Sequence, residues 1–63
     1  MQNELKLYRE KRGLTQTELA EISGVSRSTI ANLENQRAKG CQLRNMQKIS
    51  DALGYSIRNI FLL

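Results

Sequence analysis

The chain has 63 residues, and its ten Lys and Arg outnumber six Asp and Glu, for a net charge of +4. This length fits one small domain over residues 1–63, and the charge favours a polyanionic partner, although many small soluble domains are also basic. One cysteine, no histidine and no long apolar run exclude a disulfide framework, the usual zinc sites and a membrane span. We therefore expect a cytoplasmic protein that is not an enzyme and needs no metal, cofactor or small-molecule ligand.

The first predicted element is a helix over residues 4–12. Leu5 and Tyr8 stand three positions apart, so they share its buried side. Asn3 is the expected N-cap, because its side chain can accept a hydrogen bond from the first turn. Gly13 is expected to end the helix in a left-handed conformation.

A second helix is predicted over residues 15–23. Thr15 and Glu18 have the spacing of a capping box, in which each side chain accepts a hydrogen bond from the other residue's backbone N–H. Gly24 then allows a tight turn, because glycine adopts a positive φ at little cost. Ser26 is expected to cap the helix that follows.

The third predicted helix, over residues 26–35, has one buried and one polar face. Ile30 and Leu33 stand three apart on the buried face. The outward side carries no long apolar residue, and three of its side chains can offer hydrogen bonds: Arg27, Ser28 and Asn32. A helix with this surface is suited to a polar partner such as the base edges of a DNA major groove.

The last two helices are predicted after a loop over residues 35–42. The inner stripe of the fourth helix is expected to comprise Leu43, Met46, Ile49, Ala52 and Leu53. Gly54 closes this helix, and Ser56 caps a short fifth helix. In the loop, Cys41 is expected to be an ordinary reduced thiol, with a redox-sensing role as the alternative.

Residues 13–35, GLTQTELAEISGVSRSTIANLEN, resemble the helix-turn-helix of the Cro and phage-repressor type, a family of small bacterial and phage DNA-binding regulators. Residues 48–61, KISDALGYSIRNIF, resemble the fourth and fifth helices of that family. The resemblance implies an all-α, compact five-helix bundle of the lambda-repressor-like type, with the helix-turn-helix at about residues 15–35. The chain departs from the family at Gln36, where glycine is common, and it lacks the family's loop proline.

The third helix supplies the predicted base contacts. In this motif the first turn of the recognition helix meets base edges, which places Arg27 and Ser28 there, and Asn32 one turn further on. The resemblance implies base contacts for the same three residues. The guanidinium of Arg27 can bind guanine N7 and O6, with a phosphate contact or a solvated charge as the alternative, and Asn32 can bind adenine or a phosphate.

Phosphate contacts are predicted around the groove, where donors fix the position of the protein. The candidates are Gln16, Thr17, Thr29, Asn35, Arg37 and Lys39. The resemblance implies that Gln16 grips a phosphate from the start of the second helix. A carboxylate at Glu34 would repel phosphate and therefore needs an internal partner. The resemblance implies that this partner is Arg9, in an ion pair that ties the first helix to the third.

The C-terminal end is the predicted homodimer interface. Its five apolar residues offer more apolar surface than one small core can bury: Ile57, Ile60, Phe61, Leu62 and Leu63. A dimer also reads a longer DNA site than one helix-turn-helix can.

The function predicted from the sequence is regulation of transcription, as a repressor, by sequence-specific binding to double-stranded DNA at an inverted repeat. One alternative is a protein-interaction module, such as the antitoxin of a toxin–antitoxin pair or an anti-repressor, although the chain leaves no segment to cover a toxin. The other is RNA binding, although the sequence shows no platform of exposed aromatic residues.

Overall fold

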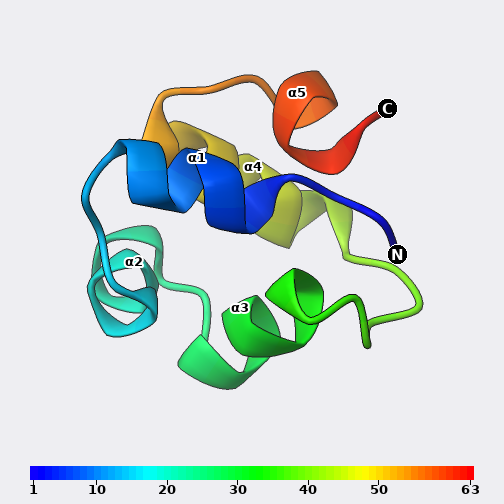
Figure 1. Cartoon of the computed structure of the whole chain (residues 1–63), viewed down its shortest axis with the longest axis horizontal. Helices are drawn as coiled ribbons and strands as arrows, with labels where there is room; N and C mark the ends of the chain where they lie inside the picture. The colour runs from blue at the N-terminus through cyan, green and yellow to red at the C-terminus, as the bar shows by residue number, and fades with distance from the viewer.

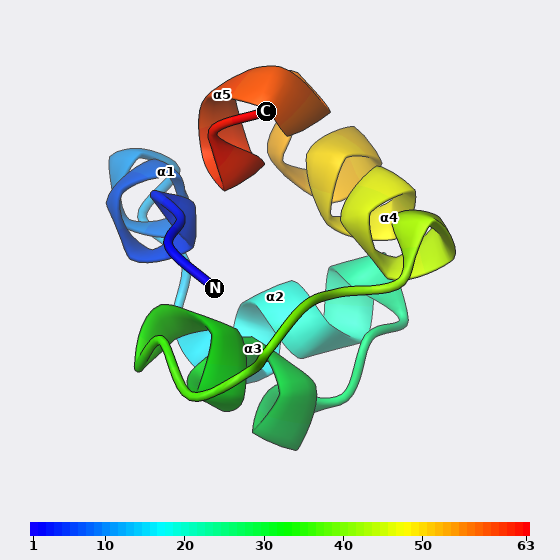
Figure 2. The ribbon, with the colours of Figure 1, turned by 90° about the vertical axis from the view of Figure 1, so that its right-hand side faces the viewer.

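The computed structural model describes all residues from Met1 to Leu63 and contains five α-helices and no strand. In chain order these are α1 (Leu5–Lys11), α2 (Gln16–Ser23), α3 (Arg27–Glu34), α4 (Leu43–Leu53) and α5 (Ile57–Phe61). Figure 1 shows α1 crossing in front of α4, with α2 and α3 below them. Figures 1 and 2 share a vertical axis, and in both views α3 lies at the lower edge and α5 at the upper edge. The predicted all-α fold of five helices is confirmed.

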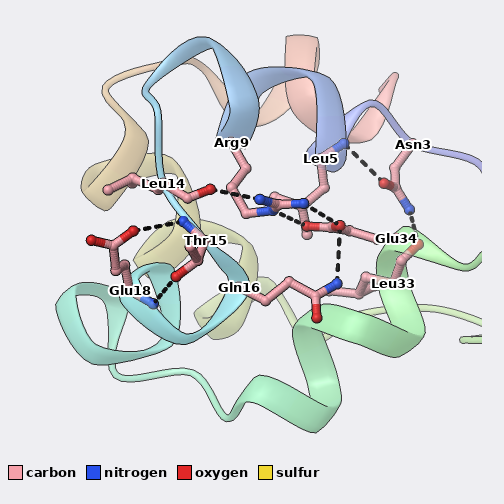
Figure 3. A network of polar contacts seen from close by, with 9 residues as sticks. All are labelled: Asn3, Leu5, Arg9, Leu14, Thr15, Gln16, Glu18, Leu33 and Glu34. Atoms are coloured by element: carbon pink, nitrogen blue, oxygen red, sulfur yellow. Dashed lines mark hydrogen bonds and ion pairs between the residues drawn. The ribbon is translucent and has the colours of Figure 1, made fainter.

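The local signals between helices act as the sequence predicts. Thr15 Oγ1 accepts a hydrogen bond from the Glu18 backbone nitrogen at 3.0 Å, and Glu18 Oε1 accepts one from the Thr15 nitrogen at 2.8 Å (Figure 3). Gly24 ends α2 at a φ of 77°. The Ser26 hydroxyl accepts a hydrogen bond from the Thr29 nitrogen and so caps α3. These caps satisfy helix-end groups that have no partner within the helix, and they fix the turn between α2 and α3.

All five helices contribute to one core of ten buried apolar residues. They are Leu5, Leu19, Val25, Ile30, Leu33, Met46, Ile49, Leu53, Ile60 and Phe61. Only Val25 lies outside a helix, in the turn before α3, so its side chain fixes that turn against the core.

The expected inner stripe of α4 is wrong at its first residue. The side chain of Leu43 is 70% exposed, whereas Met46 and Ile49 are buried. Each step of three residues falls about 60° short of a full helical turn, so a stripe built from such steps leaves the core face at its ends. Leu43 is also the first residue of α4, whereas Ser50, seven residues later on nearly the same side of the helix, is buried, so the exposure of Leu43 reflects its place at the helix end.

Asn3 joins α1 to α3 instead of serving as the N-cap itself. The N-cap position of α1 belongs to Glu4, whose side chain makes no capping hydrogen bond. One residue earlier, Asn3 Oδ1 accepts a hydrogen bond from the Leu5 nitrogen at 3.0 Å, and Asn3 Nδ2 donates to the carbonyl oxygen of Leu33 at 2.9 Å (Figure 3). The Leu33 carbonyl lies in the last turn of α3, where carbonyl groups lack helical partners. One side chain therefore stabilises the start of α1 and the end of α3.

Gln36 leaves α3 in a left-handed conformation, with a φ of 59°. That conformation costs a residue with a Cβ about 1–2 kcal/mol, and glycine avoids this cost. Glycine is also more flexible in the unfolded chain, which lowers the gain in stability by about 0.5–1 kcal/mol. We expect Gln36→Gly to raise the free energy of unfolding by about 0.5–1 kcal/mol, measured by urea denaturation. Gln36→Ala is the matched control, because it removes the same side chain and keeps the strain. A glycine variant no more stable than the alanine variant would contradict this interpretation.

Candidate nucleic-acid interface

The outward face of α3 carries the three predicted base-contacting residues. Arg27, Ser28 and Asn32 are all exposed, whereas Ile30 and Leu33 hold the opposite face in the core. No other helix lies below α3 in Figure 1 or Figure 2, so this face is open to a partner. The structure therefore presents the three side chains together, on a helix fixed by its buried face.

The predicted phosphate contacts lie at both ends of α3 and beside it. Thr17 is exposed in the first turn of α2, and Asn35, Arg37 and Lys39 are exposed at the end of α3 and in the following loop. Thr29 is half-buried, and its Oγ1 accepts a hydrogen bond from the Ser26 hydroxyl at 2.8 Å, which leaves its own hydroxyl proton free to donate. These exposed or half-buried groups can donate to an anion, and Gln16 can do so through one N–H, because the other is bonded to Glu34.

Positive charge predominates in the chain segment that runs from α3 into α4. Between Ile22 and Ser50 the chain has a single carboxylate, Glu34, and its side chain is only 3% exposed. The same stretch has five cationic side chains, all exposed: Arg27, Arg37, Lys39, Arg44 and Lys48. With its one carboxylate buried, this segment, which includes α3 and the loop after it, is suited to a polyanion.

Glu34 is paired with Arg9, as the resemblance implies. The Nε of Arg9 lies 2.6 Å from Glu34 Oε2 and its Nη2 lies 3.0 Å from Oε1, which makes the pair bidentate (Figure 3). The hydrogen bond to Glu34 raises the pKa of Arg9 above its ordinary value, against the lowering effect of burial. The Nη1 of Arg9 also donates to the carbonyl oxygen of Leu14 at 2.6 Å. One guanidinium therefore connects α1, the α1–α2 turn and α3.

The structure adds a contact that the sequence did not predict. Gln16 Nε2 donates a hydrogen bond to Glu34 Oε1 at 3.1 Å, so the amide at the start of α2 binds the carboxylate at the end of α3 (Figure 3). A carboxylate has about four acceptor positions and Arg9 fills only two of them. That surplus of acceptor positions is the one signal that points to a further donor, but it does not identify Gln16.

Two of the three apolar residues of α5 are part of the core. Ile60 and Phe61 are 0% and 1% exposed, so the prediction that they contact a second copy is wrong. The reason is that α5 packs against α4 and α1, and the backbone nitrogen of Glu4 also donates to the carbonyl oxygen of Ile60 at 2.7 Å. Leu62 and Leu63 remain 54% and 66% exposed.

The Cys41 thiol is half-buried, and burial raises its pKa above the ordinary value. A redox-sensing thiol needs a lowered pKa, because the thiolate is the reactive form. The shift has the opposite sign, which favours an ordinary reduced thiol.

The structure has no pocket and no group of three metal-ligating side chains. None of its helices has the length and apolar character that crossing a membrane requires.

Comparison with known proteins agrees with this arrangement. A family described as helix-turn-helix matches residues 5–60, which run from the start of α1 into α5. The chain is also 40% identical over 62 residues to an uncharacterized HTH-type transcriptional regulator of Methanocaldococcus jannaschii, an alignment that covers 98% of this chain and 92% of that protein. The chain therefore belongs to the helix-turn-helix family of DNA-binding transcriptional regulators, of the Cro and phage-repressor type.

Proposed function

We propose that this protein is a repressor that binds an inverted-repeat DNA operator as a homodimer, with α3 of each copy in the major groove. The observation that carries the proposal is the outward face of α3, where Arg27, Ser28 and Asn32 are exposed and the one carboxylate of the helix is buried against Arg9. A major groove accepts a helix of this size and offers each base pair as a distinct pattern of donors and acceptors.

The surroundings of α3 supply the phosphate contacts of the proposed complex. Gln16 and Thr17 lie in the first turn of α2, where free backbone N–H groups and the helix dipole favour an anion. Asn35, Arg37 and Lys39 follow the end of α3. Phosphate contacts on both sides of a recognition helix set its register in the groove, and the base contacts then select the sequence.

The position of the chain ends supports a dimer at the side of the molecule. Both chain ends, the loop over residues 35–42 and the start of α4 lie at the right in Figure 1 and face the viewer in Figure 2. A twofold axis along that side turns both α3 helices toward the same lower edge. The exposed Leu62 and Leu63, with the half-buried Ile57, supply apolar surface for the contact. Occupation of two successive major grooves then represses transcription by blocking access to the DNA.

RNA is a poorer fit than duplex DNA. The aromatic rings of Tyr8 and Tyr55 pack against each other with centroids 4.5 Å apart, and Phe61 is buried. The guanidinium of Arg12 covers the Tyr55 ring at 4.6 Å from its centroid. These aromatic rings are therefore occupied within the fold, whereas sequence-specific RNA binding usually needs exposed rings for base stacking.

Selection of bound duplexes from a random pool tests the proposal. We expect an inverted repeat with half-sites centred about 10 base pairs apart, roughly 34 Å, because a twofold dimer places its recognition helices one helical turn apart. Binding to the selected duplex should weaken steeply as salt concentration rises. Preference for single-stranded RNA, or no enriched sequence at all, would contradict the proposal.

Arg27 is expected to determine the preference for one base pair in each half-site. Because its guanidinium can bind guanine through two parallel hydrogen bonds, Arg27→Ala should cost about 1–3 kcal/mol on the best site. The loss of binding free energy should be smaller on duplexes that differ from the best site at that base pair. Competition binding with duplexes that carry single base-pair substitutions measures this difference. An equal loss of affinity on every duplex would make Arg27 a phosphate contact.

Arg37 and Lys39 are expected to contribute to affinity without affecting sequence preference. Replacing either with alanine should weaken specific and non-specific binding alike and lower the slope of log K against log salt by about one per contact, hence about two in a dimer. Lys6→Ala is the matched control, because Lys6 is an exposed cation on α1, outside both α3 and the loop that follows it. If both loop variants keep the wild-type slope, the loop lies away from the DNA backbone.

A further inference from the structure

Gln16 is the only predicted DNA-contacting residue whose side chain is bonded to the Arg9–Glu34 pair. The Glu34 carboxylate accepts hydrogen bonds from three side-chain nitrogens, two of Arg9 and one of Gln16. The Glu34 side chain is 3% exposed, and the half-buried Gln16 at the start of α2 is one of the two residues whose side chains bind its carboxylate. Figure 3 shows the amide nitrogen turned toward Glu34 and the amide oxygen turned away.

This contact fixes the atoms that Gln16 can offer to a ligand. An ionised carboxylate only accepts hydrogen bonds, so it holds the NH2 end of the amide and excludes the flipped orientation. One N–H of that group is used by Glu34, and the second N–H and the carbonyl oxygen have no hydrogen-bond partner in the structure. A free glutamine side chain has several rotamers and loses much of that freedom on binding. A side chain already held in one rotamer loses less, so it binds more tightly.

We propose that Glu34 is a positioning residue for DNA binding, which holds the Gln16 amide so that its second N–H meets a DNA phosphate. The proposal rests on the proposed function and adds a role for a residue that does not itself touch DNA. Repulsion between Glu34 and the phosphate is small because the bidentate contact with Arg9 neutralises the carboxylate. The same buried pair therefore connects the stability of the domain to the geometry of one phosphate contact.

A double-mutant cycle on the selected operator measures the coupling. Gln16→Ala is expected to weaken binding by about tenfold per half-site, the effect of a hydrogen bond to a charged group. In a Glu34→Gln background, where the acceptor-only group is lost, the same Gln16→Ala change should cost less than about threefold. If the loss of affinity in the double variant equals the product of the losses in the two single variants, the proposal is overturned. Circular dichroism at the assay temperature verifies that each variant is folded.

A second pair of variants keeps the test valid if Glu34→Gln fails to fold. Arg9→Met combined with Glu34→Leu replaces the buried ion pair with apolar side chains of similar volume, a change that is often neutral or stabilising. This double variant should remain folded, bind more weakly than wild type and lose the coupling to Gln16. Wild-type affinity in the folded double variant would overturn the proposal.

Neutral methylphosphonate substitutions, one position at a time along the operator, separate positioning from general stability. Substitution at one phosphate should weaken operator binding by the wild-type protein and leave binding by Gln16→Ala unchanged. That phosphate is the one that Gln16 contacts. The Glu34 variants should lose sensitivity at that position and keep it at the phosphates of Arg37 and Lys39. Equal losses at all positions would mean a purely structural role for Glu34. If wild type binds the operator but Gln16→Ala does not weaken it, this inference fails while DNA binding stands.

Discussion

Glu34→Ala is expected to unfold a large part of the protein at 25 °C. The substitution leaves the guanidinium of Arg9, whose side chain is only 11% exposed, without its bidentate partner, and the Gln16 amide without its acceptor. Removing one partner of a buried ion pair costs about 3–5 kcal/mol. A domain of this length has roughly 3–9 kcal/mol of total stability at about 0.05–0.15 kcal/mol per residue. Urea denaturation followed by circular dichroism measures the loss.

Glu21→Ala is the matched control for that experiment. Glu21 is a carboxylate on the exposed side of α2 and has no ion-pair partner in the structure. Its replacement should change the stability by less than about 0.5 kcal/mol, as surface substitutions usually do. A Glu34→Ala protein as stable as Glu21→Ala would show that the Arg9–Glu34 pair is not a major source of stability.

Leu62→Glu together with Leu63→Glu is expected to yield a monomer that binds the operator about a thousandfold more weakly. Both side chains are exposed in the structure, so the charges leave the core intact. In the proposed dimer the same charges would be buried at the contact between copies. Burial of an unpaired charge removes its hydration and therefore strongly destabilises the dimer. A monomer contacts one half-site, and specific dimer binding exceeds non-specific binding by at least about a thousandfold. Sedimentation equilibrium and operator binding measure the two effects.

Leu7→Glu is the control for the dimer experiment, because Leu7 is an exposed leucine on α1. It should leave both association and DNA affinity near wild type. A wild-type monomer that binds a single half-site one-to-one would rule out the dimer. A dimer that tolerates both C-terminal charges would keep twofold binding and move the interface elsewhere, to Leu7 itself or the loop around Cys41.

The sequence predicts the helices well because their limits depend on neighbours in the chain. The Thr15–Glu18 capping box, Gly24 and Ser26 each act within four residues, and the observed bounds of the first three helices differ from the predicted ones by one residue. The base-contact candidates on α3 follow from the same local pattern, because a buried seam at Ile30 and Leu33 leaves the other side exposed.

Features that depend on contacts between distant segments could not be predicted in the same way. Burial of Ile60 depends on the packing of α5 against α1, near the other end of the chain, and the polarity of the sequence gives no indication of that contact. The two roles of Asn3 appear only when the end of α3 lies beside the start of α1. The bond between Gln16 and Glu34 joins positions 18 residues apart through a carboxylate whose second partner could have been any nearby donor.

The division of α3 into an attached face and a free face has an evolutionary consequence. The helix is held by Ile30, Leu33 and Glu34, and none of these side chains reaches the outward surface. Substitutions at Arg27, Ser28 and Asn32 therefore change stability little, within about 0.5 kcal/mol for ordinary surface positions. Relatives of this protein can diverge in the DNA sequence they recognise by exchanging a few outward residues, while the scaffold that carries them stays under separate selection for folding.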